Sequence, residues 1–567
     1  MKILKTKCVC LIWLLLLSVN TLTVMAQSDP TGKSVVTRTY ALTKATVIPS
    51  PGQEITEATV LIKDGLIVSV GKNVSLPADA EVIDATGLYI YAGFIDGMSN
   101  TGAKRPKAPE RPSNLFTPDP PNDYAGITPE NSVVSQLDIS SSSIAGMRKV
   151  GFTISHTVPY GRMLPGSGSL LLLTEVDHID ELILAKDVAM YTQFTGAPGA
   201  YPNNILGIMA KWRNLYRNAV NDKAHADMYA ENPAGLPRPD ADRVSRAFFP
   251  VLTKERPVFF DVDEMLDVRR AMRLQKDLGF TLVVAGVKQG WDLMNDLKST
   301  NTPVFMSLDL PDEPKEIKVD EKTAEVEAQE KRRMEFYKKY VEQAGQYEKA
   351  GIAFGFSTKG SRGNKIKGNI ITMIENGLSE EAALAALTTN PASIIGISQI
   401  AGTVEAGKLA NLIVSTAPYF TKDSQIKMMF VDGDKYEYEI KEKKAKKDKE
   451  EATEAPATAS TGNDPIIGSW SFSFITPQGE QTGKMIIKKN DSGAYEGVLT
   501  SDDGSPDNDM NNVSFQNGEL AFDFSIDAGG QAIEIVVVGT VTGKNYDAEA
   551  SIAAFNVSFE LTATKDE

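Results

Sequence analysis

The sequence has very little cysteine. Only two cysteines occur among 567 residues, and both of them, Cys8 and Cys10, lie within the first 26 residues. Cys8 follows a lysine directly and does not close an apolar run, as a lipid-attachment cysteine would. Without residues 1–26 the chain has no thiol, which excludes disulfides, thiolate–zinc sites and cysteine nucleophiles.

The chain has one long apolar run, and it lies at the N-terminus. Three lysines precede an apolar stretch from Cys8 to Val19, and Val24-Met25-Ala26 follows. This is the pattern of a cleaved secretory signal peptide, and the run is shorter than the ~20 residues of a spanning helix. We predict that residues 1–26 are a signal peptide and that the protein is periplasmic or secreted. A retained membrane anchor is the alternative.

Histidine is also scarce, with only three in the chain. None has a His-x-His or His-x-x-x-His partner, the spacings that would bind a metal from one strand or helix. His156 lies in the apolar run "GFTISHTV" and is predicted to be a core or strand-end residue. His178 lies near Asp177 and Asp180, and we interpret it as the start of a solvent-exposed helix rather than as part of a metal cluster. His225 is expected on the surface, in a polar connection.

Basic residues are fewer than acidic ones. The net charge is −15, and the removal of residues 1–26, which hold three lysines and no acid, brings it to −18. Such a surface repels nucleic acid, so no nucleic-acid partner is expected. No segment after the signal is long and apolar enough to span a membrane, so no membrane span is expected after cleavage.

The hydrophobic pattern changes several times along the chain. Residues 35–90 form short β-rich runs with a hairpin signal at Lys63-Asp64-Gly65. From about 135 to 400, apolar strands alternate with helical stretches, which predicts an α/β fold with a (β/α)8 TIM-like barrel. The proline-rich segment 104–121 is expected to be extended and could cover the barrel mouth, and 312–350 reads as a solvated surface helix.

A second domain follows the barrel region. Residues 441–463 combine a charge block with an Ala/Thr/Pro run, the composition of a linker. Residues 464–567 contain about eight short alternating runs, which predict an antiparallel β-barrel or β-sandwich with Trp470 in its core.

Three stretches of the sequence carry a family resemblance. They are "IKDGLIVSVG" with "VIDATGLYIYAGFID", then "AYPNNILGIMAKWRNLYRNA", and "NPASIIGISQIAGTVEAGKLANLIV". Together they resemble the amidohydrolase superfamily, in particular its imidazolonepropionase-like group. The resemblance implies a barrel over 93–402, and a small β-sandwich made from residues 27–92 and 403–440. The C-terminal domain resembles lipocalin-like modules only weakly.

The resemblance also locates the family's metal site, which uses zinc or another divalent metal to hydrolyse C–N bonds other than peptide bonds. In the family, Gly-Phe-Ile-Asp is followed by His-x-His, but Met98 and Asn100 stand here. The fifth-strand and sixth-strand histidines correspond to Asp261 and Gly286, and the eighth-strand aspartate falls near Thr358. No candidate for a bridging lysine appears on strand four. Only Asp261 could coordinate, so no metal and no other cofactor is expected.

Three functions remain open. The favoured one is a non-catalytic, exported protein that binds a small-molecule or peptide-like ligand, or pairs with an active amidohydrolase relative or with its own copies. The second is a C–N hydrolase with an unorthodox centre or none, in which Asp96, Asp261, Asn100 or Lys359 contact the ligand. The third places function in the C-terminal β-domain. Whether the chain is an enzyme is therefore left open.

Overall fold

The computed structural model describes residues 38–440 and 464–566, apart from 108, 318–322, 477–478, 491–494, 502–506, 517, 528–531 and 553–556. The predicted signal peptide 1–26 and linker 441–463 lie outside the described residues. The chain divides into two compact units, Met1–Lys443 and Lys444–Glu567, each of which is described by itself. None of the helices within the described residues is both long and apolar enough to cross a bilayer.

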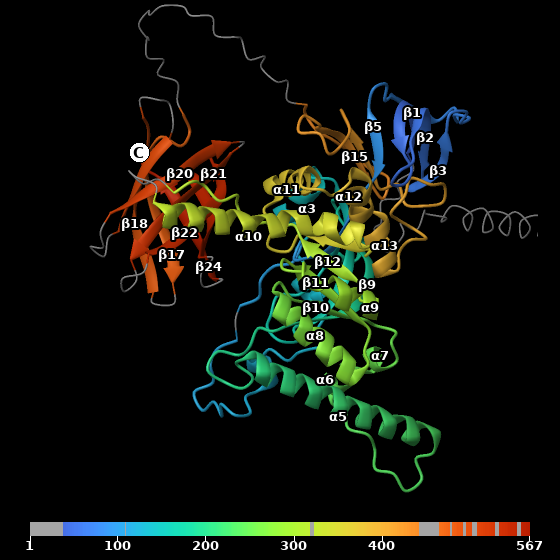
Figure 1. Ribbon diagram of the computed structural model, residues 1–567, viewed down its shortest axis with the longest axis vertical. Helices are drawn as coiled ribbons and strands as arrows, with labels where there is room; N and C mark the ends of the chain where they lie inside the picture. The colour runs from blue at the N-terminus through green and yellow to red at the C-terminus, as the bar shows by residue number, and fades with distance from the viewer. Residues whose placement is uncertain are drawn as a thin grey trace, which may run out of the picture. The chain divides into compact units, whose positions relative to one another are not determined.

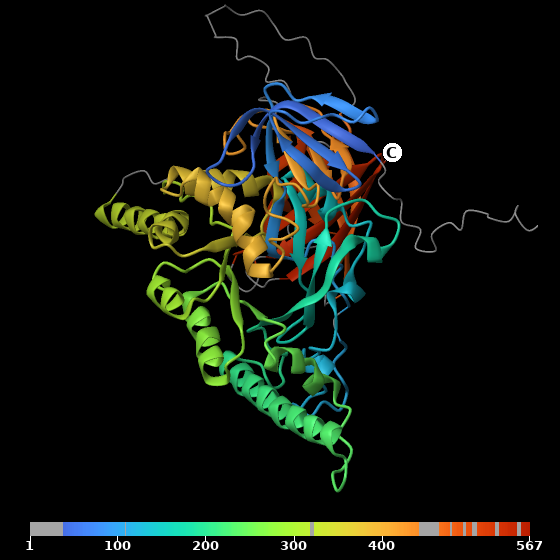
Figure 2. The ribbon, with the colours of Figure 1, turned by 90° about the vertical axis from the view of Figure 1, so that its right-hand side faces the viewer.

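The first unit contains an eight-stranded barrel (Figures 1 and 2). Its strands pair in chain order, from β6 to β13. They are β6 (Phe94–Ser99), β7 (Phe152–Thr157), β8 (Gly166–Leu172), β9 (Ile183–Gln193), β10 (Val258–Asp261), β11 (Leu282–Val287), β12 (Val304–Ser307) and β13 (Phe354–Ser357). The last strand returns to the first, because Ser357 Oγ donates a hydrogen bond to the Met98 carbonyl at 2.7 Å. The predicted α/β barrel is confirmed.

One strand departs from the expected repeat of parallel strands. β8 is antiparallel to both β7 and β9, whereas the other neighbouring pairs are parallel. The connection over 158–165 is too short for a crossover, since parallel neighbours need about a dozen residues or more between them. The short loop therefore forces β8 to run backwards.

Amphipathic helices cover the barrel. In α8 (Met265–Leu278) the buried residues Val268, Ala271 and Leu274 recur at helical spacing, and the helix ends at Gly279 with a φ of 84°. The other helices and single turns are α2 (Asn122–Ala125), η1 (Val133–Gln136), α3 (Ser142–Lys149), α4 (Ile179–Leu182), α5 (Ile205–Glu231), α6 (Arg243–Ala247), α7 (Phe249–Leu252), α9 (Met294–Thr300), α10 (Ala324–Lys349), α11 (Gly363–Glu375), α12 (Glu380–Leu387) and α13 (Thr389–Ile395).

The charged insertion is only partly what the sequence predicts. It forms α10, whose first turns are exposed, but Val341, Ala344 and Tyr347 in its second half are buried. The Tyr347 hydroxyl donates to the Gly290 carbonyl at 2.8 Å. The expectation of a solvated surface helix is therefore wrong for this half, because an apolar stripe with a spacing of three residues binds it to the barrel.

Large side chains fill the inside of the barrel. Phe305 of β12 lies against the backbones of Gly97 and Gly355, where a Cβ atom would come within 1.9 Å and 2.4 Å of its ring. Phe259 stacks on Phe305 with ring centroids 5.8 Å apart. Two glycines on the adjacent strands β6 and β13 thus make room for one aromatic ring, and the interior is a packed core.

The two ends of the barrel region meet in a second sheet. It contains β1 (Thr39–Ile48), β2 (Ile55–Lys63), β3 (Leu66–Gly71), β4 (Ala80–Asp84), β5 (Tyr89–Ala92), β14 (Leu412–Ser415), β15 (Ile426–Val431) and β16 (Asp434–Glu437). β5 pairs with β14 and so joins the two segments. Tyr40 of β1 packs on Phe430 of β15 at 5.4 Å although the two strands are not neighbours, so the sheet curves around its own core.

The second unit is a closed antiparallel barrel. Its strands are β17 (Gly468–Thr476), β18 (Gly479–Lys489), β19 (Tyr495–Ser501), β20 (Asn508–Gln516), β21 (Glu519–Asp527), β22 (Ala532–Thr542), β23 (Asn545–Ile552) and β24 (Val557–Lys565). Trp470 is buried, as predicted, and its indole N–H donates to the Ile466 carbonyl at 2.9 Å.

The fit of Phe305 against Gly97 leads to a stability prediction. We expect Gly97→Ala to lower the free energy of unfolding by about 1–3 kcal/mol, because the added methyl group overlaps a buried ring that has no free space to enter. Urea denaturation of the purified chain measures this change.

Gly146 provides the matched control. It lies in α3, is exposed, and has no atom within 4 Å of an added Cβ, so Gly146→Ala should raise stability by about 0.5–1 kcal/mol. Equal effects of the two substitutions would contradict the packing described for the barrel interior.

Candidate functional site

The barrel brings together residues from four strand ends. Gly286 has a φ of 77°, and a Cβ atom there would lie 2.7 Å from Asp261 Oδ1 and 3.4 Å from Met98 Cε. On the other side, the Lys359 backbone N–H donates to the Met98 carbonyl at 3.2 Å, directly after Thr358. The positions at which the resemblance implies metal ligands, at the ends of β6, β10, β11 and β13, therefore surround one place at the carboxyl end of the barrel.

Asp261 is held by two partners. The Lys359 ammonium lies 2.8 Å from Asp261 Oδ2, and the Tyr191 hydroxyl donates to the same oxygen at 2.7 Å. Burial and the nearby Asp261 carboxylate raise the pKa of Tyr191 well above its usual value. The phenol therefore stays protonated and acts as a donor, and the charge of Asp261 is balanced by an ammonium group.

Asp96 has no exposed surface and does not reach the mouth of the barrel. Its Oδ1 accepts from the backbone N–H groups of Met98 at 3.2 Å and Thr358 at 3.1 Å, and its Oδ2 accepts from the Thr358 hydroxyl. Burial raises the pKa of Asp96 to about 7, although these hydrogen bonds act in the opposite direction. Asp96 was expected to contact a ligand, but here it links β6 to β13 inside the barrel wall.

Asn100 is also engaged by the protein. Its side-chain amide donates to the Val158 carbonyl at 2.8 Å and so ties the end of β6 to the loop after β7. This contact orients the amide toward the loop backbone.

None of the three histidines belongs to the group of side chains around Asp261. His156 is buried in β7, its Nδ1 lies 3.0 Å from the Gly97 carbonyl, and burial lowers its pKa to about 4, so it is a neutral core residue as predicted. His178 is exposed and precedes α4, also as predicted. His225 lies within α5, so the expectation of a polar connection is wrong.

A second ion pair lies next to the first, and sequence reasoning did not find it. Lys288 and Asp309 follow β11 and β12, and the Lys288 ammonium lies 2.6 Å from Asp309 Oδ2. A Cβ atom on Gly360 would lie 3.8 Å from that same oxygen, which places this pair beside Lys359. The only signal in the sequence was that both residues, like Tyr191 near the end of β9, occur close to strand ends.

The proline-rich segment 104–121 reaches the rim of the barrel. The Tyr201 backbone N–H donates to the Thr117 carbonyl at 2.8 Å, and just after the segment the Tyr124 hydroxyl donates to the Pro198 carbonyl at 2.9 Å. Pro198 and Tyr201 belong to the loop that follows β9. The segment thus packs against a loop at the carboxyl end of the strands.

These side chains do not fit a divalent metal. Met98 and Gly286 offer no hard donor, Asn100 is oriented toward a backbone carbonyl, and Asp261 already binds an ammonium. The described residues contain no group of three or more His, Cys, Asp or Glu side chains arranged to bind a metal ion.

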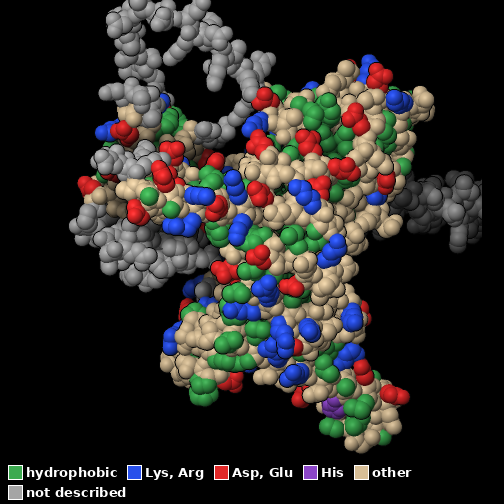
Figure 3. Space-filling view, viewed as in Figure 1, with side chains coloured by type: hydrophobic (Ala, Val, Ile, Leu, Met, Phe, Trp, Pro, Cys, Tyr) green, Lys and Arg blue, Asp and Glu red, His purple; other side chains and the backbone are tan. Residues whose placement is uncertain are grey.

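On the surface, Figure 3 shows acidic and basic side chains interspersed over the visible face.

Comparisons with known proteins agree with this fold. Residues 326–435 match the family model described as the Amidohydrolase family. An amidohydrolase from Thermotoga maritima MSB8 is similar with a TM-score of 0.58 and 21% identity, over 70% of this chain and 100% of that chain. A prolidase complexed with N-methylphosphonate-L-proline has a TM-score of 0.43 and 16% identity, over 71% and 100%. No curated protein matches. Residues 326–435 are thus similar to the Amidohydrolase family, and the first unit has the fold of the Thermotoga protein.

The buried Asp96 makes stability depend on pH. Its pKa is about 7 in the folded chain and near 3.8 when exposed, so the folded state holds a proton that the unfolded state has lost. Between these two values the free energy of unfolding should fall as the pH rises, by about 3 kcal/mol from pH 4 to pH 7. Urea denaturation at both pH values measures this slope.

Asp96→Asn isolates the contribution of this carboxyl. Asparagine keeps an acceptor for Met98 and Thr358 and is neutral at both pH values. The free energy of unfolding of the variant should therefore not show the decrease between pH 4 and pH 7 that we attribute to Asp96. Burial lowers the pKa of His156, so the titration of this residue makes the free energy of unfolding rise with pH. This contribution is the same in the wild type and in the variant. An identical slope for the wild type and the variant would refute the prediction.

Proposed function

We propose that this chain is a non-catalytic member of the amidohydrolase superfamily, and that its barrel binds a ligand or a protein partner and does not hydrolyse C–N bonds. The observation that carries the proposal is the contact between Asp261 and Lys359. Among the positions that correspond to metal ligands, only Asp261 has a side chain suited to a metal, and a protein cation already binds it at 2.8 Å.

Electrostatics explains why this contact weakens a metal site. A dication next to the Lys359 ammonium would be repelled, and it would have to displace that ammonium to reach the shared oxygen of Asp261. One carboxylate would then be its only charged ligand, whereas catalytic zinc sites use three protein ligands. Lys359 supplies a single positive charge at the place where the family holds its metal.

The mouth remains suited to binding. Two ion pairs, Asp261 with Lys359 and Lys288 with Asp309, are partly exposed there. Such groups can exchange a protein partner for a polar ligand, and a small peptide-like or heterocyclic molecule fits that chemistry. An active relative or a second copy of this chain is the protein partner that we propose, in the periplasm or outside the cell. The C-terminal barrel, proposed to be lipocalin-like, would be an additional binding module.

Metal content tests the proposal directly. We expect no stoichiometric metal in the purified chain after incubation with zinc, manganese and iron and removal of the excess, because the only metal-type ligand is neutralised. Atomic emission spectroscopy measures this. About one metal per chain would overturn the proposal and support a C–N hydrolase, with Asp261→Ala as the first variant to be assayed for turnover.

A reconstructed site serves as the positive control. Met98→His and Asn100→His restore the His-x-His pair, and Lys359→Ala releases Asp261. The triple variant then offers two imidazoles at the end of β6 and one carboxylate at the end of β10, and it should bind zinc where the wild type does not.

The ion pair should also contribute to stability. We expect Lys359→Met to lower the free energy of unfolding by about 2 kcal/mol, because it leaves a carboxylate that is only 15% exposed without its cation. Lys365→Met is the control, since the Lys365 and Asp312 side chains are 41% and 83% exposed, and it should cost less than about 1 kcal/mol. Equal losses in urea denaturation would contradict a special role of Lys359.

A further inference from the structure

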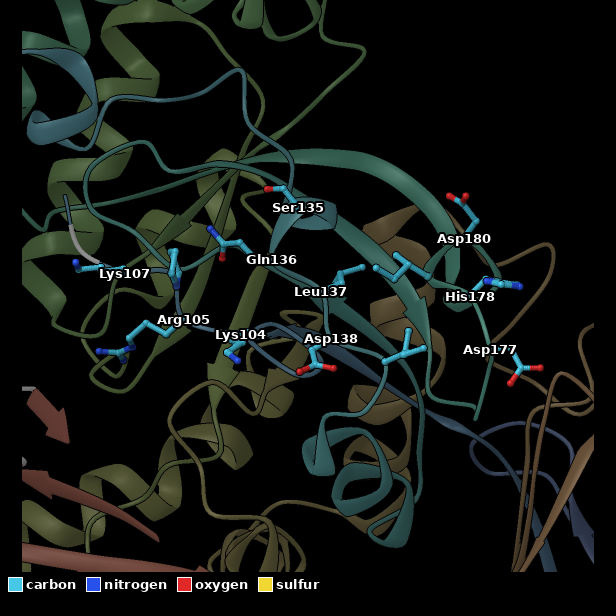
Figure 4. Close-up of a pocket in the computed structure, with 13 residues that line it drawn as sticks. Lys104, Arg105, Lys107, Ser135, Gln136, Leu137, Asp138, Asp177, His178 and Asp180 are labelled. Carbon is cyan, nitrogen blue, oxygen red and sulfur yellow. The ribbon is translucent and has the colours of Figure 1, made fainter. Parts of the chain in front are cut away.

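The first unit contains an open groove that is separate from the barrel mouth. Its volume is about 770 Å³, and three segments line it, 104–107, 135–139 and 177–180 (Figure 4). The first segment follows β6, the second includes the end of η1, and the third leads into α4. None of the residues that surround Asp261 takes part.

One end of the groove is cationic. Lys104, Arg105 and Lys107 lie within four consecutive positions and are all exposed, and they outnumber the one acidic lining residue near them, Asp138, which interacts with Lys104. The Arg105 guanidinium lies over the Tyr160 ring, 5.0 Å from its centroid, and such stacking leaves the edge of the guanidinium available for a carboxylate. Lys107 has an exposed acidic neighbour, Glu110, at 3.2 Å.

The other end of the groove is acidic. Asp177 and Asp180 lie there beside His178, at the side opposite the basic residues in Figure 4. Asp180 also contacts Lys186 at 2.9 Å. The two ends of this groove thus carry opposite charges, although the chain as a whole has a net charge of −15.

Apolar side chains and a fixed backbone connect the two ends. Leu137 is buried, and Ile139 and Ile179 line the groove next to it. The Gln136 side chain accepts from the Tyr160 backbone N–H at 2.8 Å and donates to the Tyr160 carbonyl at 3.1 Å. The Lys104 backbone N–H donates to the Gln136 carbonyl at 2.7 Å. The cationic end and the groove wall are therefore joined to one another and preformed.

We propose that this groove binds a short extended peptide by its two ends. The peptide's carboxylate end lies against Lys104 and Arg105, its ammonium end against Asp177 and Asp180, and its apolar side chains against Leu137, Ile139 and Ile179. The charge complementarity identifies this ligand class, because an anionic end, an apolar middle and a cationic end are what a peptide with free termini provides. The volume lies within the range of small-ligand sites, about 300–1,000 Å³.

A pair of peptides of identical composition tests the orientation. Lys-Val-Leu-Glu has its positive charges at the amino end and its negative charges at the carboxyl end, whereas in Glu-Val-Leu-Lys each end is neutral overall. Isothermal titration calorimetry with the full chain should show that Lys-Val-Leu-Glu binds at least ten times more tightly than Glu-Val-Leu-Lys. Its Kd should increase as salt is added. Equal affinities for the two peptides, or no binding of either, would overturn the proposal.

Variants locate the binding. Arg105→Glu should weaken the binding of Lys-Val-Leu-Glu at least tenfold, and Lys276→Glu, an exposed change of the same charge on α8, should leave it unchanged. The double variant Arg105→Glu with Asp177→Lys reduces the charge of both ends, so it should weaken the binding of Lys-Val-Leu-Glu further than Arg105→Glu alone. If Asp261→Asn abolished binding and Arg105→Glu did not, the peptide would bind at the barrel mouth and the groove proposal would fail.

Discussion

Closure of the barrel between its first and last strands is the constraint on which the rest of the first unit depends. Side chains make this closure. Asp96 on β6 accepts two hydrogen bonds from Thr358, and Ser357 donates to the Met98 carbonyl. A fully buried carboxylate is a costly way to join two strands, and its raised pKa reflects that cost. Its donors belong to Met98 at the end of β6 and to Thr358 just after β13, so a single side chain satisfies groups at both strands.

The same closure determines what the mouth of the barrel contains. Because Thr358 is held by Asp96, the next residue, Lys359, leaves β13 at a defined point and its ammonium reaches Asp261 on β10. Gly286 is needed on the neighbouring strand β11, since a Cβ atom there would lie 2.7 Å from Asp261 Oδ1. Phe305 then fills the barrel below, against the glycines of β6 and β13. The packed interior and the charged mouth are consequences of one set of strand contacts.

Much of this fold could be predicted from local patterns. The alternation of apolar strands with amphipathic helices predicted the α/β barrel, and the short alternating runs after residue 464 predicted the antiparallel barrel. Predictions from local patterns were wrong where the structure depends on loop length or on contacts between distant segments. The reversal of β8 follows from the length of one loop, and the burial of the second half of α10 depends on contacts with the loop after β11. His225 was misplaced because its polar neighbours are equally compatible with the exposed side of a long helix.

The site was predictable in position but not in chemistry. The family resemblance indicated which positions to compare, and each residue type could be read directly from the sequence. That Asp261 is paired with Lys359, and not left free, depends on two strand ends that are distant along the chain. This pairing bears on the positions of Met98, Asn100 and Gly286, where the resemblance implies metal ligands. A site that had only lost ligands would leave an uncompensated carboxylate at the mouth, and partial burial would make that costly. Here an ammonium balances the charge and the phenol of Tyr191 donates a hydrogen bond, so the Asp261 carboxylate has both a counter-ion and a donor within the protein.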